Sequence, residues 1–323
     1  MSVKKITVGD ADDGLRLDRW FHTNFPQVTH GRLEKLLRRG EVRVDGGRVR
    51  ANLRLAPGMV VRVPPLPETP PDMPSSVPVS AADAADLKSR ILHRDDMLIV
   101  IDKPAGLAVQ GGSGTTRHLD GLLDALRFDA SERPRLVHRL DRDTSGVLVL
   151  ARTRAAAATV TAAFRDRAAK KLYWALVRGV PHPAAGRIES TIEKTAAGGG
   201  REQMASSATG KSAVTVYRTV AQASERFAWL ALTPVTGRTH QLRVHCSEAG
   251  YPIVGDRRYG DRPETPAHTE VLGRGLHLHA RRLEMPHPGG GTLRVIAPLP
   301  SHMLQSWQCL GFDPGADDPE ADI

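Results

Sequence analysis

The stretch HRLDRDTSGVLVLAR, residues 138–152, joins a charged segment to a continuous apolar run. The apolar run from Val147 to Ala151 is typical of a strand that is buried on both faces of a sheet. The segment before it, residues 138–146, carries histidine, arginine, aspartate and hydroxyl side chains. A rigid strand holds the adjoining loop in place. We therefore expect residues 138–146 to form a loop that presents reactive side chains at the end of a buried strand.

Patterns on both sides of this stretch predict a domain rich in strands. A helix is predicted over Thr153–Lys170, where Val160 and Phe164 lie four residues apart. Many strands with few helices favour a mixed α/β or α+β domain. Apolar or alternating patterns predict further strands at 97–104, 171–179, 213–220, 227–235 and 292–299.

Residues 14–63 form a separate basic segment, with eleven Lys and Arg against four Asp and Glu. The apolar residues of RLDRWFHTNF (16–25) and HGRLEKLLRRGEV (30–42) recur at helical spacing, and Gly40 is expected to end the second helix. VRVDGGRV (42–49) predicts a hairpin with an Asp-Gly turn, and a turn and a last strand are expected within 55–64.

The second of these helices carries four cations, Arg32, Lys35, Arg38 and Arg39. Such a run is often only a solvated helix face. In this segment few acidic residues balance the basic ones, and the whole chain has a formal net charge of +9. Binding to RNA phosphates is therefore the better interpretation. The segment resembles the S4 RNA-binding domain in its RLDRW opening and its LLRRGEVRVDG helix-turn-strand, although THGR stands where that family usually has a Ser-Arg pair.

Composition indicates how the rest of the chain is divided into domains and in which cellular compartment the protein works. Seven prolines within 64–78 predict an extended linker, placed at 64–88. We expect domains at 1–63 and 89–312 and a disordered acidic tail at 313–323. The chain has only two cysteines, no apolar signal-peptide core and no run of 18 apolar residues. A cytoplasmic protein without a membrane partner is therefore expected; the sequence leaves the oligomeric state open, and a monomer is assumed.

Two possible cofactor signals are weak. The stretch QGGSGTTRH (110–118) lacks the Gly-Lys-Ser/Thr ending of a phosphate loop. The pairs His240/His245 and His277/His279 lack the three or four well-spaced ligands of a zinc site, so hydrogen-bonding or RNA-contacting histidines are the alternative. We expect neither a cofactor nor a metal.

Asp141 and Asp143 are the carboxylates of the opening stretch. They could work as an acid and base pair, or Asp143 could form a salt-bridged surface turn with Arg142. Neighbouring arginines would keep both ionised, and an ionised aspartate is a poor acid but a serviceable nucleophile or metal ligand. Asp141 fits a surface turn less well, because its neighbours are apolar.

The wider stretch RLVHRLDRDTSGVLVLAR resembles the catalytic motif of the RluA-type pseudouridine synthases. The resemblance covers nearly all of 89–312. The Gly-Gly-Ser-Gly stretch is most similar to the RluC type, the branch that acts on large-subunit (23S) ribosomal RNA, and Asp102 stands where the family more often has Asn. The other family blocks follow in order: DKPAGLAVQGGSG (102–114), KKLYWALVRG (170–179), TPVTGRTHQLRVHCSEAGYPIVGDRRYG (233–260) and GLHLHARRLEMPHP (275–288).

This resemblance implies an α+β catalytic domain with a mixed, mostly antiparallel sheet, besides the small S4-like α/β domain. It implies isomerisation of uridine to pseudouridine without a cofactor. Asp141 matches the catalytic aspartate, and Arg243 matches the arginine that pairs with it, with Arg238 as the weaker candidate. Tyr173 matches the tyrosine that stacks on the target base and whose hydroxyl could take the C5 proton.

The target uracil must leave its RNA stack to reach Asp141. Arg139 matches a residue that can fill the vacated space, and a phosphate contact is the alternative. Thr144 is expected to shape the loop. The full set expected to bind RNA is Arg139, His138, Thr144, Arg238, His240, Arg32, Lys35, Arg38 and Arg39.

Two other functions fit parts of the sequence. One is a ribosome-associated RNA-binding protein that has lost activity, which the intact set of Asp141, Tyr173 and Arg243 argues against. The other is a metal-dependent nuclease that uses Asp141 and Asp143, which lacks a further acidic cluster near them.

Overall fold

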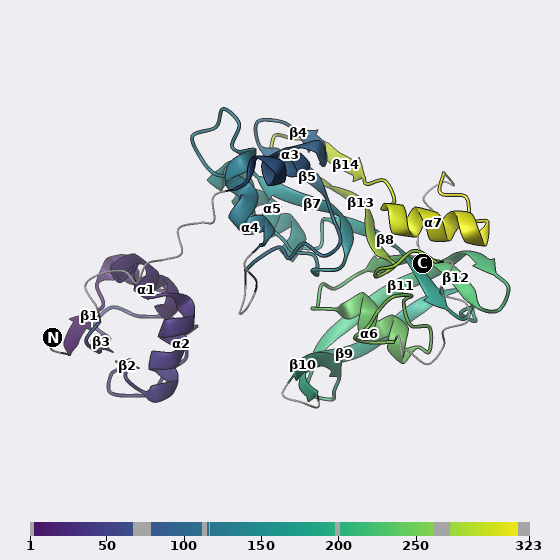
Figure 1. Cartoon of the computed structure of the whole chain (residues 1–323). Coiled ribbons are helices and arrows are strands. Elements are labelled where there is room, and N and C mark those ends of the chain that lie inside the picture. Colours follow the sequence, from purple (N-terminus) through teal and green to yellow (C-terminus); the bar gives the residue numbers. More distant parts are fainter. Residues whose placement is uncertain are drawn as a thin grey trace. The chain divides into compact units, whose positions relative to one another are not determined.

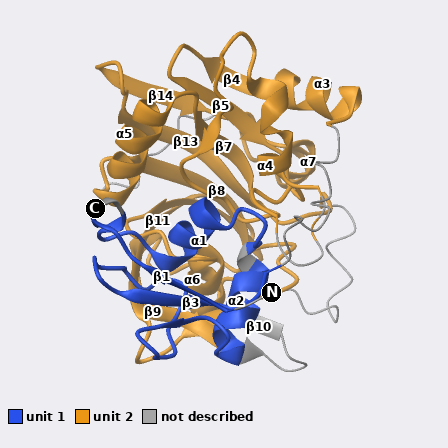
Figure 2. Ribbon diagram, turned by 90° about the vertical axis from the view of Figure 1, so that its left-hand side faces the viewer, with its two compact units in different colours: residues 1–78 blue, residues 79–323 orange. Residues whose placement is uncertain are grey.

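The computed structural model describes residues 3–66, 79–111, 115, 117–197, 201–260 and 272–315. The chain forms two compact units, unit 1 at Met1–Pro78 and unit 2 at Val79–Ile323 (Figure 2). Most of the expected linker (67–78), part of the Gly-rich stretch (112–114 and 116) and most of the expected acidic tail (316–323) lie outside the described residues. Among the described residues, no helix is both long and apolar enough to cross a membrane.

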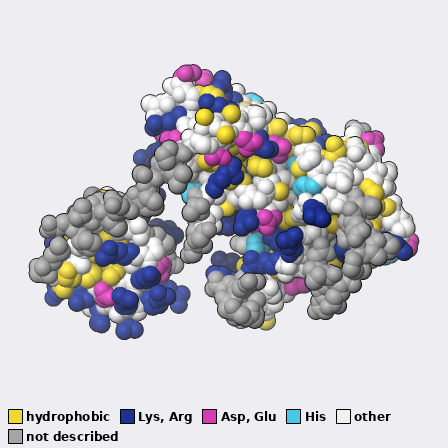
Figure 3. Space-filling view, in the orientation of Figure 1, with side chains coloured by type: hydrophobic (Ala, Val, Ile, Leu, Met, Phe, Trp, Pro, Cys, Tyr) yellow, Lys and Arg dark blue, Asp and Glu magenta, His cyan; other side chains and the backbone are white. Residues whose placement is uncertain are grey.

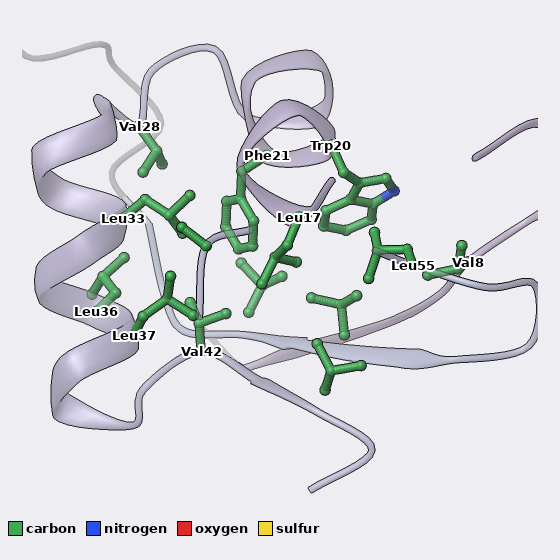
Figure 4. Packing of buried hydrophobic residues seen from close by; sticks show 14 residues of the cluster. Val8, Leu17, Trp20, Phe21, Val28, Leu33, Leu36, Leu37, Val42 and Leu55 are labelled. Carbon is green, nitrogen blue, oxygen red and sulfur yellow. The ribbon is translucent and has the colours of Figure 1, made fainter. Parts of the chain in front are cut away.

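Unit 1 packs two helices on a small sheet. Its antiparallel sheet has the order β1-β3-β2. Both predicted helices are confirmed, and Figure 4 shows Leu17 and Phe21 of the first on the side toward Leu33 and Leu37 of the second, with Trp20 beside Leu55. The elements are β1 (Lys4–Thr7), η1 (Asp10–Asp12), α1 (Leu17–Asn24), α2 (His30–Arg39), β2 (Arg43–Val44) and β3 (Val60–Val63).

Local chemistry sets both ends of α2. The Thr29 hydroxyl accepts the Arg32 backbone N–H at 3.4 Å, and Gly40 ends the helix in the left-handed region at φ 69°. The predicted hairpin at 42–49 is only partly right. Asp45 and Gly46 make the tight turn, with φ of 49° and 78°, but β2 pairs with the distant β3. The Asp45 carboxylate reinforces this non-local pairing by accepting the Val60 N–H at 2.8 Å.

Unit 2 is built on one large sheet, in the order β10-β9-β11-β12-β8-β13-β7-β5-β4, with β14 on β13 and β6 on β7 (Figure 1). Its pairings are antiparallel except for that between β13 and β7, so the expected mixed, mostly antiparallel α+β fold is confirmed. The strands are β4 (Ile91–Arg94), β5 (Leu98–Lys103), β6 (Arg135–Leu136), β7 (Ser145–Ala151), β8 (Lys170–Arg178), β9 (Ala185–Ala197), β10 (Arg201–Ser206), β11 (Lys211–Ala223), β12 (Phe227–Pro234), β13 (Leu278–Pro286) and β14 (Thr292–Ile296).

Strand β7 lies between two apolar layers. All seven of its residues are buried, which confirms the prediction for this run. Val147 and Val149 face a cluster that includes α5 (Arg154–Arg165). Leu148 and Leu150 face the opposite cluster, which includes α3 (Ala81–Ser89), α4 (Leu119–Leu122) and η2 (Leu123–Leu126). The alternation follows from the two-residue period of a strand, and it gives the loop before β7 a rigid base.

The parallel contact of β13 with β7 is short and close. It consists of His279 opposite Ser145 and Ala280 opposite Gly146. Gly146 has φ 108°, and a Cβ there would lie 2.2 Å from the Ala280 carbonyl oxygen. Only glycine fits this backbone conformation and this approach.

Several elements differ from the sequence-based expectation. Helix α3 forms within the segment that the sequence analysis assigned to the linker. Its Leu87 is buried in the core and packs the helix against the rest of unit 2. Helix α5 ends at Arg165 rather than Lys170. Strands β9 and β10 and the helices α6 (Gln241–Glu248) and α7 (Ser301–Leu310) were not predicted. α6 and α7 pack on opposite faces of β8 and β12.

Candidate active site

A pocket of about 780 Å³ lies beside the loop that precedes β7. Residues 138–141 and Thr144 line it together with the end of α5, the start of β8 and residues 233–243, which we call the α6 wall. It brings together all of the site residues expected in unit 2: Asp141, Tyr173, Arg243, Arg139, His138, Thr144, Arg238 and His240. The space-filling view shows Lys, Arg, His and acidic side chains mixed on one face of this unit (Figure 3).

Lys103 holds the loop that precedes β7. The sequence analysis did not name it as a site residue. Its side chain is fully buried, and its Nζ donates to the carbonyl oxygens of Pro104, Leu107 and Arg142 at 2.8–2.9 Å. Burial lowers the pKa of Lys103 to about 7, although nearby aspartates, Asp143 first, raise it in part. Three acceptors match the three N–H donors of an ammonium group, so this side chain fixes the backbone of the loop.

His138 fixes the start of the same loop. Its Nε2 accepts the Val149 backbone N–H at 2.8 Å, and its ring stacks on Phe164 with centroids 4.3 Å apart. Burial, with the charge of Lys171, lowers the pKa of His138 to about 3. The imidazole is therefore neutral and already engaged by the backbone.

Asp141 projects into the pocket and faces Arg243. Its Oδ2 lies 3.7 Å from Arg243 Nη1, and its Oδ1 lies 3.8 Å from His240 Nε2. Its side chain is 19% exposed, against 7% for Arg243, so the carboxylate is the more accessible of the two groups. The Asp141 carbonyl also accepts the Thr144 N–H at 3.2 Å, which closes the turn that presents the side chain. Asp143 is exposed and lies 3.5 Å from Arg142, as the surface-turn interpretation predicts.

The closest partner of Arg243 is Asp256, another residue that the sequence analysis did not single out. Arg243 Nε and Nη2 donate to the two Asp256 oxygens at 2.7 Å each, and Asp256 is buried. Burial alone would lower the pKa of Arg243, but the hydrogen bonds and charge of Asp256 more than offset it and raise the pKa. This bidentate pair keeps the guanidinium charged and aimed, with Nη1 left toward Asp141.

His240 lies on the Oδ1 side of Asp141. It precedes α6 in the left-handed region, at φ 55°, and its Nδ1 lies 2.7 Å from the Tyr259 hydroxyl. Burial lowers the pKa of His240, partly opposed by the charge of Asp141. We therefore expect a neutral ring near pH 7.

Tyr173 lies on β8, half-buried between two apolar clusters. Burial and the charge of Asp141 raise the pKa of its hydroxyl. Tyr173 is therefore a protonated phenol, with an apolar ring beside the pocket.

Buried polar contacts anchor α6. Gln241 Oε1 accepts the Thr236 hydroxyl at 2.6 Å, and its Nε2 donates to Val214 O and to Thr215 Oγ1. His245 Nδ1 lies 2.9 Å from the same Thr215 hydroxyl. This network ties the helix that carries Arg243 to β11.

The remaining expected RNA contacts divide between the units. Arg139 is exposed at the pocket, Thr144 is buried, and Arg238 Nε donates to Ser212 O at 3.0 Å. The expected cations of α2 belong to unit 1, where Lys35, Arg38 and Arg39 are exposed and Arg32 is half-buried. Lys103 and Asp256 do lie in the family blocks quoted above, and this was the only signal for them.

Comparisons with known proteins identify the family of this chain. The family model for RNA pseudouridylate synthase matches residues 97–248. The chain is 37% identical over 316 residues to ribosomal large subunit pseudouridine synthase C of Salmonella typhimurium, covering 96% of this chain and 97% of that protein. It is 38% identical over 307 residues to the protein of the same name from Yersinia pestis, covering 93% of each.

A solved structure has a similar fold. Human RNA Pseudouridylate Synthase Domain Containing 4 matches with a TM-score of 0.61 and 32% identity, covering 71% of this chain and 95% of that one. The resemblance stated from the sequence is thus confirmed: the chain belongs to the RNA pseudouridylate synthase family, in its RluA-type branch.

Proposed function

We propose that this protein isomerises specific uridines of large-subunit ribosomal RNA to pseudouridine, with Asp141 as its catalytic carboxylate. The observation that carries the proposal is the position of Asp141, an open carboxylate 3.7 Å from a guanidinium that Asp256 locks in place. The ribosomal substrate is supported by the printed names of the relatives, which cover almost the whole chain.

The reaction breaks the N1–C1′ bond of uridine and forms a C5–C1′ bond, after which C5 loses a proton and N1 gains one. Atoms and electrons balance without a co-reactant. Asp141 would attack the ribose or the base, or assist departure of uracil through a glycal-like step. Each route uses the carboxylate group of Asp141, and Arg243 Nη1 lies 3.7 Å from its Oδ2.

Tyr173 and Arg243 would act around this carboxylate. The Tyr173 ring offers an apolar face on which an extruded uracil can stack, and its hydroxyl is a candidate for proton transfer at C5. Because the pKa of Tyr173 is raised, the hydroxyl would need help from a base, and Asp141 is the carboxylate whose charge acts on it. Arg243 would keep Asp141 aimed at the reacting carbon.

RNA would reach the site by extrusion of one nucleotide into the pocket. Arg139 is exposed at the rim and could fill the vacated space or contact a phosphate. The cations on α2 of unit 1 would add sequence-independent affinity in the manner of an S4 domain. We propose a monomer that works in the cytoplasm.

Tritium release tests the proposal. The substrate is large-subunit ribosomal RNA labelled at uridine C5, taken from cells that lack this protein. Wild type should release tritium into water with a chelator present, and Asp141→Asn should lower the rate by a factor of about 10⁴ or more while RNA binding persists.

Two results would contradict this proposal. Salt-sensitive binding without release by wild type would favour the binding-only alternative. Chelator-sensitive strand cleavage would favour the nuclease.

A further inference from the structure

The side of the pocket formed by residues 164–172 is rich in cations, and we call it the α5–β8 wall. Arg165, Arg167, Lys170 and Lys171 all line the pocket here. Arg165 forms an ion pair with Asp166, with Nε–Oδ1 and Nη2–Oδ2 distances of 2.9 and 3.2 Å. Lys170 lies directly opposite Glu284 in the pairing of β8 with β13.

Arg167 and Lys171 differ from these two. Neither side chain forms a hydrogen bond or ion pair with another residue of the part of the chain that the structure describes. Burial, and next the charge of Arg167, lower the pKa of Lys171. The fold therefore holds two like charges near each other, with Arg167 exposed and Lys171 half-buried, an arrangement that an anion would relieve.

The backbone gives a second, independent observation. Arg167 follows the end of α5 with φ 62°, and the next N–H, of Ala168, returns to the Ala163 carbonyl at 2.9 Å. This is the helix-ending turn in which glycine usually occupies the left-handed position. An arginine there costs free energy that glycine would not, and such outliers occur at functional sites.

We propose that Arg167 and Lys171 bind a backbone phosphate of the RNA next to the extruded nucleotide. The inference rests on the proposed function and assigns the α5–β8 wall to holding the strand. A phosphodiester fits because it supplies acceptor oxygens and a single negative charge to two cations that lack a carboxylate. A contact of this kind binds ground state and transition state alike, so it acts on affinity rather than on the chemical step.

The test uses Arg167→Gly, Lys171→Met and the double variant of the full chain, with Arg154→Met as the matched control. Arg154 is an exposed cation at the other end of α5 and does not line the pocket. Binding to unmodified transcribed large-subunit ribosomal RNA is measured from low to high KCl, and tritium release is measured with saturating RNA.

We expect the double variant to bind about tenfold to a hundredfold more weakly at low salt. Its slope of log affinity against log salt should fall by about 0.7, the value for one phosphate on a single strand. The kcat should stay within about twofold of wild type. Arg167→Gly should not lower the melting temperature, because glycine suits the left-handed position, and Lys171→Arg should restore binding.

The outcomes separate the two proposals. Unchanged affinity and salt slope in the double variant, beside an active wild type, would overturn this inference alone. A fall in kcat without a change in affinity would also overturn it. Absence of tritium release by wild type would instead reject the proposed function.

Discussion

The two sides of the pocket differ in how far their cations are paired within the protein. On the α6 wall, each cation named above has a partner: Arg243 is paired with Asp256, and Arg238 donates to the Ser212 carbonyl. On the α5–β8 wall, Arg167 and Lys171 have no acidic partner within the described residues. Internal pairing fixes a group for chemistry, whereas an unpaired cation is available to a ligand. We therefore propose that the α6 wall carries the catalytic groups and that the α5–β8 wall holds the RNA.

The largest effect on this comparison is expected from Asp256→Ala. It removes both hydrogen-bond acceptors of the buried Arg243 guanidinium and leaves it facing the more distant Asp141 carboxylate, 3.7 Å away, which costs about 3–5 kcal/mol of stability. Urea unfolding measures the free energy of unfolding. Asp166→Ala is the control, because it removes the carboxylate paired with the exposed Arg165 on the other wall and should leave the free energy of unfolding almost unchanged. Equal losses in the two variants would remove the contrast between the walls.

A smaller effect extends the comparison to unit 1. If the α2 cations hold phosphates as the α5–β8 wall is proposed to do, Arg38→Gln with Arg39→Gln should weaken RNA binding. The slope of log affinity against log salt should fall by about 0.7–0.9 for each phosphate that the variant no longer binds, with kcat unchanged. Lys4→Gln, an exposed cation on β1, is the control. A slope equal to that of wild type would make α2 a solvated helix face.

The smallest effect concerns Asp102, where the family more often has Asn. Burial raises the pKa of Asp102 to about 6, while Arg90 and Lys103 oppose this in part. The folded state therefore binds this proton more tightly than the unfolded state does, and ionisation costs stability as pH rises from about 4 to about 6. Asp102→Asn should stabilise the protein by about 1 kcal/mol at pH 7.

Thermal unfolding from pH 4 to pH 8 measures this difference. The advantage of Asp102→Asn should shrink toward zero near pH 4, where the wild-type carboxyl is protonated in the folded state. A constant advantage at every pH would mean that charge is not its cause.

The sequence predicted the elements whose residues carry a local period, and it missed those that depend on distant partners. Strands β5 and β7 are evident from their apolar runs. Helix α6 has no amphipathic stripe, because Gln241 through Cys246 are all buried, the polar ones included. Their burial is tolerated only through partners far along the chain, such as Thr215.

The same reason applies to the site. Asp141, Tyr173 and Arg243 were named through the family resemblance, and they do line one pocket. The bond between Arg243 and Asp256, and the three carbonyls gathered by Lys103, are facts of tertiary structure that no spacing encodes. The reach of the helix beyond Arg165 was overestimated because a turn centred on arginine carries no glycine signal.

The close contact between Gly146 and Ala280 has a consequence for biosynthesis. Ser145 and Gly146 directly follow the loop that carries Asp141, and their parallel partners lie 134 residues further along the chain. A ribosome must therefore complete β13 before the loop acquires its neighbouring strand. Contacts of such high sequence separation form late in folding. A partly synthesised chain would then fold its N-terminal unit and its first strands while still unable to act on RNA, and competence would appear only after β13 has been made.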